Sequence, residues 1–246
     1  MFPTQTFLPG ITSMTQYLFT PPAVPSLSIR GQTERFPVSR IFCVGRNYHA
    51  HAVEMQRPVD KSKDRLFYFT KSPQALVESG ATVPYPPQTQ NYHFEMEMVI
   101  AIGRAGFRVP AEQAHEIVYG YAAGLDMTRR DLQMVARETG RPWDLGKDVE
   151  QSAVCSDVVP MEGGIIDHGA IALEVNGVTK QSSDVDRLIW NVREIIADLS
   201  LYYHLQSGDL IYTGTPEGVG AVVPGDRITG RVEGVAEVTL IVGQPE

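Results

Sequence analysis

The sequence predicts a mixed α+β fold dominated by β-structure, a roll or barrel with few short helices. Its apolar runs are short, and 17 prolines and 22 glycines spread over 246 residues separate them, as is typical of many short strands. Helical periodicity is sparse. The pair Asn176 and Gly177 lies between two strand-like runs and predicts a hairpin, because both residues tolerate the positive φ of a type I′ turn.

We expect residues 1–40 to form an N-terminal extension and a small β lead-in, and residues 41–246 to form the main domain. Residues 1–22 carry Pro, Thr and Gln without clear periodicity, which is typical of a mobile or surface-draped extension. The remaining strands follow from apolar or alternating runs bounded by turn residues. They are expected at residues 24–30, 36–44, 66–70, 83–85, 94–102, 117–125, 171–175, 210–213, 226–228 and 235–242.

Two stretches have the pattern of longer helices. The first is expected to begin at Asp184 as N-cap and to run to Leu199, with apolar side chains at helical spacing that pack into the core. The second follows Asp126 and covers residues 129–138, with Gly140 ending it.

Composition limits the classes of partner. The formal net charge of −8 argues against nucleic acid or an anionic membrane as the main partner, although a local basic pocket can still bind a small anion. The two cysteines, Cys43 and Cys155, have neither zinc-site spacing nor the density of a disulfide scaffold. No segment has the length and apolarity of a membrane span, and the first residues lack the features of a signal peptide. We therefore expect a cytoplasmic protein.

Residues 91–102 hold two carboxylates in a run that alternates like a β-strand. His93, Glu95 and Glu97 occupy odd positions and apolar residues the even ones, which puts both glutamates on one face. A solvated strand face is the commoner origin of such a pattern. Close like charges nevertheless raise each other's pKa unless a cation compensates, and Mg²⁺ or Ca²⁺ prefers oxygen ligands.

A third carboxylate and several cations follow. Asp126 ends the apolar run at residues 117–125 and, taken alone, is best interpreted as a helix cap. Arg130 and Gln133 come next, three residues apart and so on one helical face, and residues 141–147 end in Lys147. Together these residues offer three acidic side chains for a metal and a set of cations for an anionic ligand.

At this point the chain resembles the fumarylacetoacetate hydrolase family, from about residue 42 to residue 230. Five ordered motifs carry the resemblance, at residues 44–55, 92–98, 119–133, 140–147 and 208–220. Within the family, the motifs that contain Arg130 and Lys147 are most similar to fumarylpyruvate hydrolases of gentisate degradation, followed by acylpyruvases. The resemblance implies the family's β-roll or barrel fold, a homodimer, and Mg²⁺ or Mn²⁺ bound by Glu95, Glu97 and Asp126.

His51 and Glu54 lie three residues apart on an expected short helix, where a carboxylate can orient an imidazole as a base. In the family this pair activates water, and the near-neutral pKa of free imidazole suits that role. His49 is interpreted as a surface residue. The charge-rich residues 53–65 that follow are expected to form either a solvated connection or a movable lid.

The expected activity is hydrolysis of a C–C bond in a 2,4-dioxo acid, with 3-fumarylpyruvate giving fumarate and pyruvate. The metal is expected to bind the 2-oxo acid end, and Lys147 to stabilise the developing oxyanion. Arg130 and Gln133 would orient the substrate. By resemblance Thr215 would bind a substrate carboxylate, and Lys71 is a candidate for the distal carboxylate, with a solvated strand end as its alternative.

Three alternatives stay open at this stage. The same site can serve an acylpyruvase or oxaloacetate decarboxylase. It can also serve an isomerase or decarboxylase of the hydroxymuconate type, although isomerisation does not need the water-activating pair His51 and Glu54. The third alternative is a non-catalytic metal-binding protein, whose sign would be a missing base or metal ligand.

Overall fold

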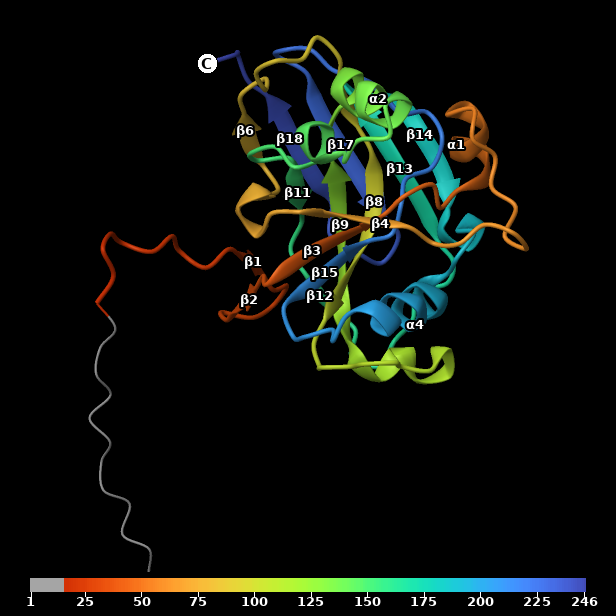
Figure 1. The fold of residues 1–246 in the computed structure, drawn as a ribbon. Coiled ribbons are helices and arrows are strands. Elements are labelled where there is room, and N and C mark those ends of the chain that lie inside the picture. Colours follow the sequence, from red (N-terminus) through yellow and green to blue (C-terminus); the bar gives the residue numbers. More distant parts are fainter. Residues whose placement is uncertain (1–15) are drawn as a thin grey trace, which may run out of the picture.

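The largest sheet forms the centre of the molecule in the computed structural model, which describes residues 16–246 (Figure 1). Its strand order is β4-β3-β15-β8-β9-β11-β5, and β12 pairs with the outer part of β9. The bounds are Arg40–Val44 for β3, Tyr68–Lys71 for β4, Leu76–Glu78 for β5, Met96–Ile102 for β8, Val118–Asp126 for β9, Ala153–Cys155 for β11, Val159–Pro160 for β12 and Asp209–Tyr212 for β15.

A second sheet packs against it, in the order β14-β13-β17-β18-β6. Its strands are Ala81–Val83 for β6, Ala170–Val175 for β13, Val178–Asp184 for β14, Arg227–Val232 for β17 and Val238–Val242 for β18. Two smaller sheets complete the described part: β10-β7-β16, at Thr128–Arg129, Tyr92–Phe94 and Gly220–Ala221, and β1-β2, at Ser26–Ser28 and Arg35–Pro37. The β-dominated fold is therefore as expected.

The two faces of β8 enter two different cores. Met96, Met98 and Ile100 point into the cluster between the two large sheets. Val99 and Ala101 point into a second cluster that Leu27 of β1, Phe36 of β2 and other residues complete. Side chains of a strand alternate between faces, so a strand buried on both faces loses the contrast between apolar and polar positions.

The helices are short. Their bounds are His49–Glu54 for α1, Arg130–Glu138 for α2, Asp144–Lys147 for α3 and Val192–Tyr202 for α4, with 3₁₀ turns at Pro73–Ala75, Ala111–Ile117 and Val185–Arg187. Figure 1 shows α1 and α2 toward the top of the view and α4 toward the bottom. In residues 16–246 no helix is long and apolar enough to cross a membrane.

The predicted start of the long helix is wrong. β14 continues to Asp184, a 3₁₀ turn follows, and α4 begins only at Val192. Asn191 is its N-cap and forms a capping box with Glu194, in which each side chain bonds the other residue's backbone N–H. Because this box satisfies two free N–H groups of the first turn, it fixes the N-cap at Asn191, seven residues later than expected.

Two other local expectations are confirmed. α2 matches the predicted residues 129–138 within one residue. The hairpin joins β13 to β14 through Asn176 and Gly177, at φ values of 51° and 77°. Of the predicted extension, residues 1–15 lie outside the described residues, whereas residues 16–22 are exposed and carry no helix or strand.

Candidate active site

A pocket of about 270 Å³ opens where α1, α2 and α3 meet the ends of the central strands. Charged and aromatic residues line it together. The complete lining is Val44, Gly45, Arg46, His51, Met55, Arg57, Phe67, Phe69, Glu95, Glu97, Arg130, Gln133, Arg137, Trp143, Lys147 and Thr215. The pocket therefore collects most of the residues that the sequence predicted for the site.

Glu95 lies at a break between two strands, which the alternating pattern did not predict. The run expected as one strand is divided into β7, which belongs to a small sheet, and β8, which belongs to the central one. Next to the break, the Met96 N–H donates to Gln181 Oε1 at 3.0 Å. That side-chain contact satisfies the Met96 N–H, and the chain changes sheet at this point. Glu95 and Glu97 nevertheless point to one place, as expected.

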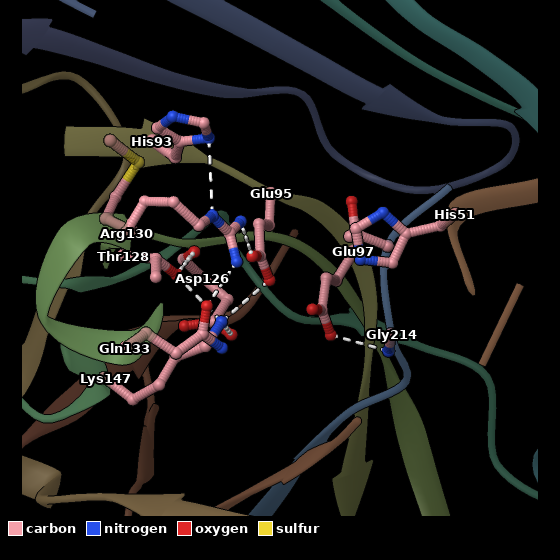
Figure 2. Close-up of polar contacts among 12 residues, drawn as sticks. His51, His93, Glu95, Glu97, Asp126, Thr128, Arg130, Gln133, Lys147 and Gly214 are labelled. Carbon is pink, nitrogen blue, oxygen red and sulfur yellow. Dashed lines mark hydrogen bonds and ion pairs between the residues drawn. The ribbon is translucent and has the colours of Figure 1, made fainter. Parts of the chain in front are cut away.

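The three carboxylates form a compact cluster (Figure 2). Each of Glu95, Glu97 and Asp126 offers an oxygen, these oxygens lie within 4.8 Å of one another, and all three residues are buried. Asp126 is the last residue of β9, and its backbone N–H donates to the Glu95 carbonyl at 2.9 Å. It does not cap α2, whose N-cap is Arg129.

Cations surround one side of this cluster. Lys147 Nζ lies 2.8 Å from Glu95 Oε2, 2.6 Å from Asp126 Oδ2 and 2.8 Å from Thr128 Oγ1. Arg130 donates to the other oxygen of Glu95. Burial alone would raise the pKa of Glu95, but the charges of Lys147 and Arg130 outweigh it and hold that pKa below its usual range. Glu95 is therefore an ionised carboxylate.

Glu97 lacks such compensation. Its Oε2 accepts a bond from the Gly214 N–H at 2.6 Å, and no salt bridge to it occurs within residues 16–246. Burial, followed by the charges of Asp126 and Glu95, raises the pKa of Glu97 well above its usual range. In Figure 2 Glu97 lies on the side of the cluster away from Lys147 and Arg130.

The residues present fit a divalent cation. Asp126 Oδ1 is buried and makes no hydrogen bond, although Lys71 Nζ lies 2.9 Å away. Glu97 carries an uncompensated carboxyl group next to it. A bound divalent cation would favour ionised Glu97 and could take oxygens of Glu97 and Asp126 as ligands, and carboxylate oxygens are the ligands that Mg²⁺ and Mn²⁺ prefer.

His51 and Glu54 form the pair that their spacing predicted. His51 Nδ1 lies 3.1 Å from Glu54 Oε2 on α1, and His51 is buried while lining the pocket. Burial would raise the pKa of Glu54, but its bonds from His51 and from the Gly218 N–H together lower it. His49 is exposed, as expected. The pair presents an imidazole to the pocket, with a carboxylate that holds one ring nitrogen.

Asn47 explains why α1 is held at the site. Its side-chain amide donates to the carbonyls of Trp190 at 2.9 Å and Thr213 at 2.8 Å, and its Oδ1 accepts from the Trp190 N–H at 2.8 Å. These bonds are fully buried. They join the turn before α1 to two distant segments, so the position of His51 is fixed by tertiary contacts.

The predicted substrate-binding residues separate into two groups. Arg130, Gln133 and Thr215 line the pocket, and Arg130 donates to Gln133 Oε1. Thr215 Oγ1 accepts from Gln181 Nε2 at 2.8 Å, the same side chain that bonds Met96. Sequence reasoning missed Gln181, because nothing local marks a glutamine on β14 as a link between the start of β8 and the loop that holds Thr215.

Lys71 differs from both of its expected roles. Its side chain is fully buried and does not line the pocket. Its ammonium bonds the Met127 carbonyl at 3.1 Å, Ser152 Oγ at 2.8 Å and the Lys147 carbonyl. It is therefore neither a solvated strand end nor placed to contact a ligand, since its donors are used to hold Asp126 and the backbone around it.

The pocket also contains residues that the sequence analysis did not select. Arg137 follows Arg130 by seven residues, a spacing that puts both on one helical face and could have been noticed. Arg46, Phe67 and Trp143 gave no signal in the sequence, because they reach the pocket only through the fold.

His93 bonds Asn91 Oδ1 at 2.8 Å, and burial together with Arg130 lowers its pKa to about 4.

Known proteins are similar to this chain over most of its length. The family described as fumarylacetoacetate (FAA) hydrolase C-terminal matches residues 40–242. A fumarylpyruvate hydrolase from Ralstonia sp. is 74% identical over 192 residues, which are 78% of this chain and 100% of that protein. The human mitochondrial oxaloacetate tautomerase is 36% identical over 207 residues, 84% of this chain and 92% of that protein.

A solved structure supports the same assignment. The fumarylpyruvate hydrolase from Pseudomonas aeruginosa, in complex with Mn²⁺ and pyruvate, superimposes with a TM-score of 0.89 at 49% identity and covers 93% of this chain and 100% of that one. The family match extends over most of the chain and includes every residue of the candidate site. The chain belongs to the fumarylacetoacetate hydrolase family.

Proposed function

We propose that this chain hydrolyses a C–C bond of a 2,4-dioxo acid at a divalent cation, with 3-fumarylpyruvate as substrate and fumarate and pyruvate as products. The observation that carries this proposal is a single pocket lined by Glu95 and Glu97 of the buried acidic triad and by His51, whose ring nitrogen contacts Glu54. The similarity to fumarylpyruvate hydrolases supports the choice of substrate.

Glu95, Glu97 and Asp126 would hold Mg²⁺ or Mn²⁺, which when bound supplies Lewis acidity and a site for the 2-oxo acid end. Lys147 adds a positive charge on the same side, held by its bonds to Glu95 and Asp126. Burial would lower the pKa of Lys147, but Asp126 and Glu95 raise it above its usual value. Lys147 therefore stays cationic and can stabilise negative charge that develops beside it.

His51 takes a proton from a water molecule, while Glu54 stabilises the imidazolium that results. The water oxygen bonds to the acyl carbonyl carbon, and the bond from that carbon to the pyruvate methylene then breaks. Its electron pair stays with the pyruvate carbon, which takes up the proton that His51 received, and the acyl fragment leaves as a carboxylic acid that ionises. Arg130 and Gln133, on α2, orient the substrate. Thr215, in the loop after β15, binds an oxygen of a substrate carboxylate.

Direct comparison of substrates tests the activity. The enzyme loaded with Mg²⁺ or Mn²⁺ is mixed with fumarylpyruvate, acetylpyruvate or oxaloacetate, and the decay of the enol absorbance is followed. Fumarylpyruvate should decay with the highest kcat/KM, and a chelator should stop the reaction. Equal or faster turnover of oxaloacetate would instead support the tautomerase activity for which the 36% identical human relative is named.

An isomerase of the hydroxymuconate type remains the second candidate, because a solved structure of 5-carboxymethyl-2-hydroxymuconate delta-isomerase from Mycobacterium smegmatis matches at 30% identity. The ordered contact between His51 and Glu54 favours hydrolysis, since isomerisation needs no activated water. A non-catalytic role would need a lost base or ligand, and the described site retains all of them.

We further propose that the catalytic domain is formed by residues 41–246, and that the protein acts in gentisate degradation as a cytoplasmic homodimer. The family match over residues 40–242 supports the domain boundary. Light scattering on the purified chain tests the dimer, and expression of residues 41–246 alone tests the boundary.

A further inference from the structure

Three arginines line the outer part of the pocket without a carboxylate partner in residues 16–246. They are Arg46, Arg57 and Arg137, and we call them the outer arginines. Arg130, deeper in the same pocket, is paired with Glu95. The contrast is informative in a chain whose formal charge is −8, because uncompensated cations that share a pocket repel each other unless an anion lies between them.

Arg137 is the best anchored of the outer arginines. It lies on α2 in the line that starts with Arg130 and Gln133, so the helix that orients the inner end of a substrate also carries Arg137. One terminal nitrogen donates to the Met55 carbonyl at 3.2 Å. A guanidinium has five N–H donors, so most of them stay available for a ligand.

Arg46 is held by an unusual backbone. Its φ of 53° lies in the left-handed region, which a non-glycine residue seldom adopts. The preceding Gly45 is pressed against Phe67, where a Cβ would come within 2.0 Å of the ring. Arg46 Cζ lies 5.0 Å from the centroid of the same ring, and within residues 16–246 its guanidinium makes one hydrogen bond, a long one of 3.5 Å to the Arg57 carbonyl.

Aromatic rings form the wall between the outer arginines and the acidic triad. Trp143 lies edge-on to Phe67 at a centroid distance of 5.5 Å, and 5.8 Å from Phe69. Phe69 in turn lies under Lys147, with Nζ 4.9 Å from the ring centroid. The pocket thus has arginines at its outer part, aromatic rings in the middle, and Lys147 and Arg130 beside the triad at its inner end. This arrangement fits a flat, apolar chain with a negatively charged group at each end.

We propose that Arg137 and Arg46 bind the carboxylate at the far end of the substrate, so that the site selects dioxo acids whose acyl group itself ends in a carboxylate. This inference rests on the proposed function, which places the 2-oxo acid end at the triad. Arginine matches a carboxylate through two parallel N–H bonds, and the trans double bond of a fumaryl group holds its carboxylate extended toward the pocket mouth. Arg57, which is exposed, adds positive charge at that mouth.

The test compares two substrates that differ in this group. Fumarylpyruvate has the distal carboxylate, whereas acetylpyruvate lacks it. In Arg137→Gln, kcat/KM for fumarylpyruvate should fall by about 10- to 150-fold, the range for one hydrogen bond to a charged group. Activity on acetylpyruvate should change by less than about twofold. Arg46→Gln should act in the same direction, and Arg137→Lys should recover part of the loss, since it keeps the charge and loses the fork.

Arg141→Gln is the matched control. Arg141 is exposed, lies four residues after Arg137 and does not line the pocket, so both activities should stay unchanged. Equal losses on the two substrates in Arg137→Gln would overturn the proposal, because they would show that Arg137 only holds the chain near Met55. No loss on either substrate would overturn it as well.

A binding measurement separates this inference from the proposed function. Calorimetry on chelator-treated enzyme compares fumarate with crotonate, which has a methyl group in place of one carboxylate. Fumarate should bind more tightly, and Arg137→Gln should remove that preference. If fumarylpyruvate is no substrate but the preference for fumarate depends on Arg137, the proposed function fails and the anion site stands. If fumarylpyruvate is hydrolysed and the preference is absent or unaffected, the inference alone fails.

Discussion

Replacement of His51 tests the proposed mechanism most directly. General-base catalysis typically contributes about 10²–10⁴-fold, which is about 2.7–5.4 kcal/mol of activation free energy. His51 is only 6% exposed, and its Nδ1 is held by Glu54. Apart from Glu54, the exposed residues of α1 point to solvent, so none of them can act as the base in place of His51. We therefore expect His51→Ala to lower kcat within this range, without loss of metal affinity.

The contribution of Glu54 can be worked from the geometry. A full charge 3.1 Å from the imidazolium contributes about 1.3–2.7 kcal/mol at an effective dielectric constant of roughly 40–80. These high values apply because 35% of the Glu54 side chain is exposed to solvent. Glu54→Gln should therefore cost roughly 10- to 100-fold in kcat. The double variant should be close to His51→Ala alone, since Glu54 acts through the imidazole.

The assay is the decay of the enol absorbance of fumarylpyruvate under saturating metal, with calorimetry of Mn²⁺ binding on each variant. His49→Ala is the control, because His49 lies on the same helix and is exposed. Full kcat in His51→Ala would refute the reasoning. Loss of metal binding in that variant would instead make His51 a metal ligand.

Four further predictions follow from the same contacts. Glu97→Ala should abolish divalent-cation binding in calorimetry with the circular dichroism spectrum unchanged, and undiminished binding would reject the ligand set. Gly214→Ala should destabilise the fold by about 1–3 kcal/mol in urea unfolding, because Gly214 has a φ of 98° and its N–H bonds Glu97; unchanged stability would contradict this. Burial raises the pKa of Cys155 to about 12, so a thiol reagent at pH 8 should label the native protein slowly and both cysteines after unfolding; fast native labelling would count against burial. Metal plus oxalate should slow proteolysis within residues 53–65, and equal cleavage rates would argue against a lid.

Local pattern was enough to predict most strands and α2, because their apolar residues alternate or recur at the period of the element itself. It failed at the start of α4. Both Asp184 and Asn191 can cap a helix, and the sequence could not show that β14 would extend to Asp184 through its pairing with β13. Tertiary pairing thus overrode a good local signal.

The residues of the site were predictable by type more than by arrangement. Residues carried by a motif, such as Glu97 and His51, could be selected, because their chemistry is visible in the sequence. Lys71 shows the limit: the sequence gives a lysine at a strand end, yet the fold buries it under Asp126 with four oxygens around its ammonium. A buried lysine with satisfied donors cannot be told from a solvated one without the surrounding backbone.

The break at Glu95 shows why the geometry of the triad could not be derived from alternation alone. In one continuous strand, Glu95 and Glu97 would lie two residues apart on the same face of a single sheet. Here Gln181 takes the Met96 N–H, and β7 leaves for another sheet, where it pairs with β10. β10 directly precedes α2, and the Arg130 N–H donates to the Asn91 carbonyl at 2.8 Å. The change of sheet therefore joins Glu95 to the helix that carries Arg130, so the proposed metal ligands and the residues proposed to orient the substrate are positioned by the same irregularity.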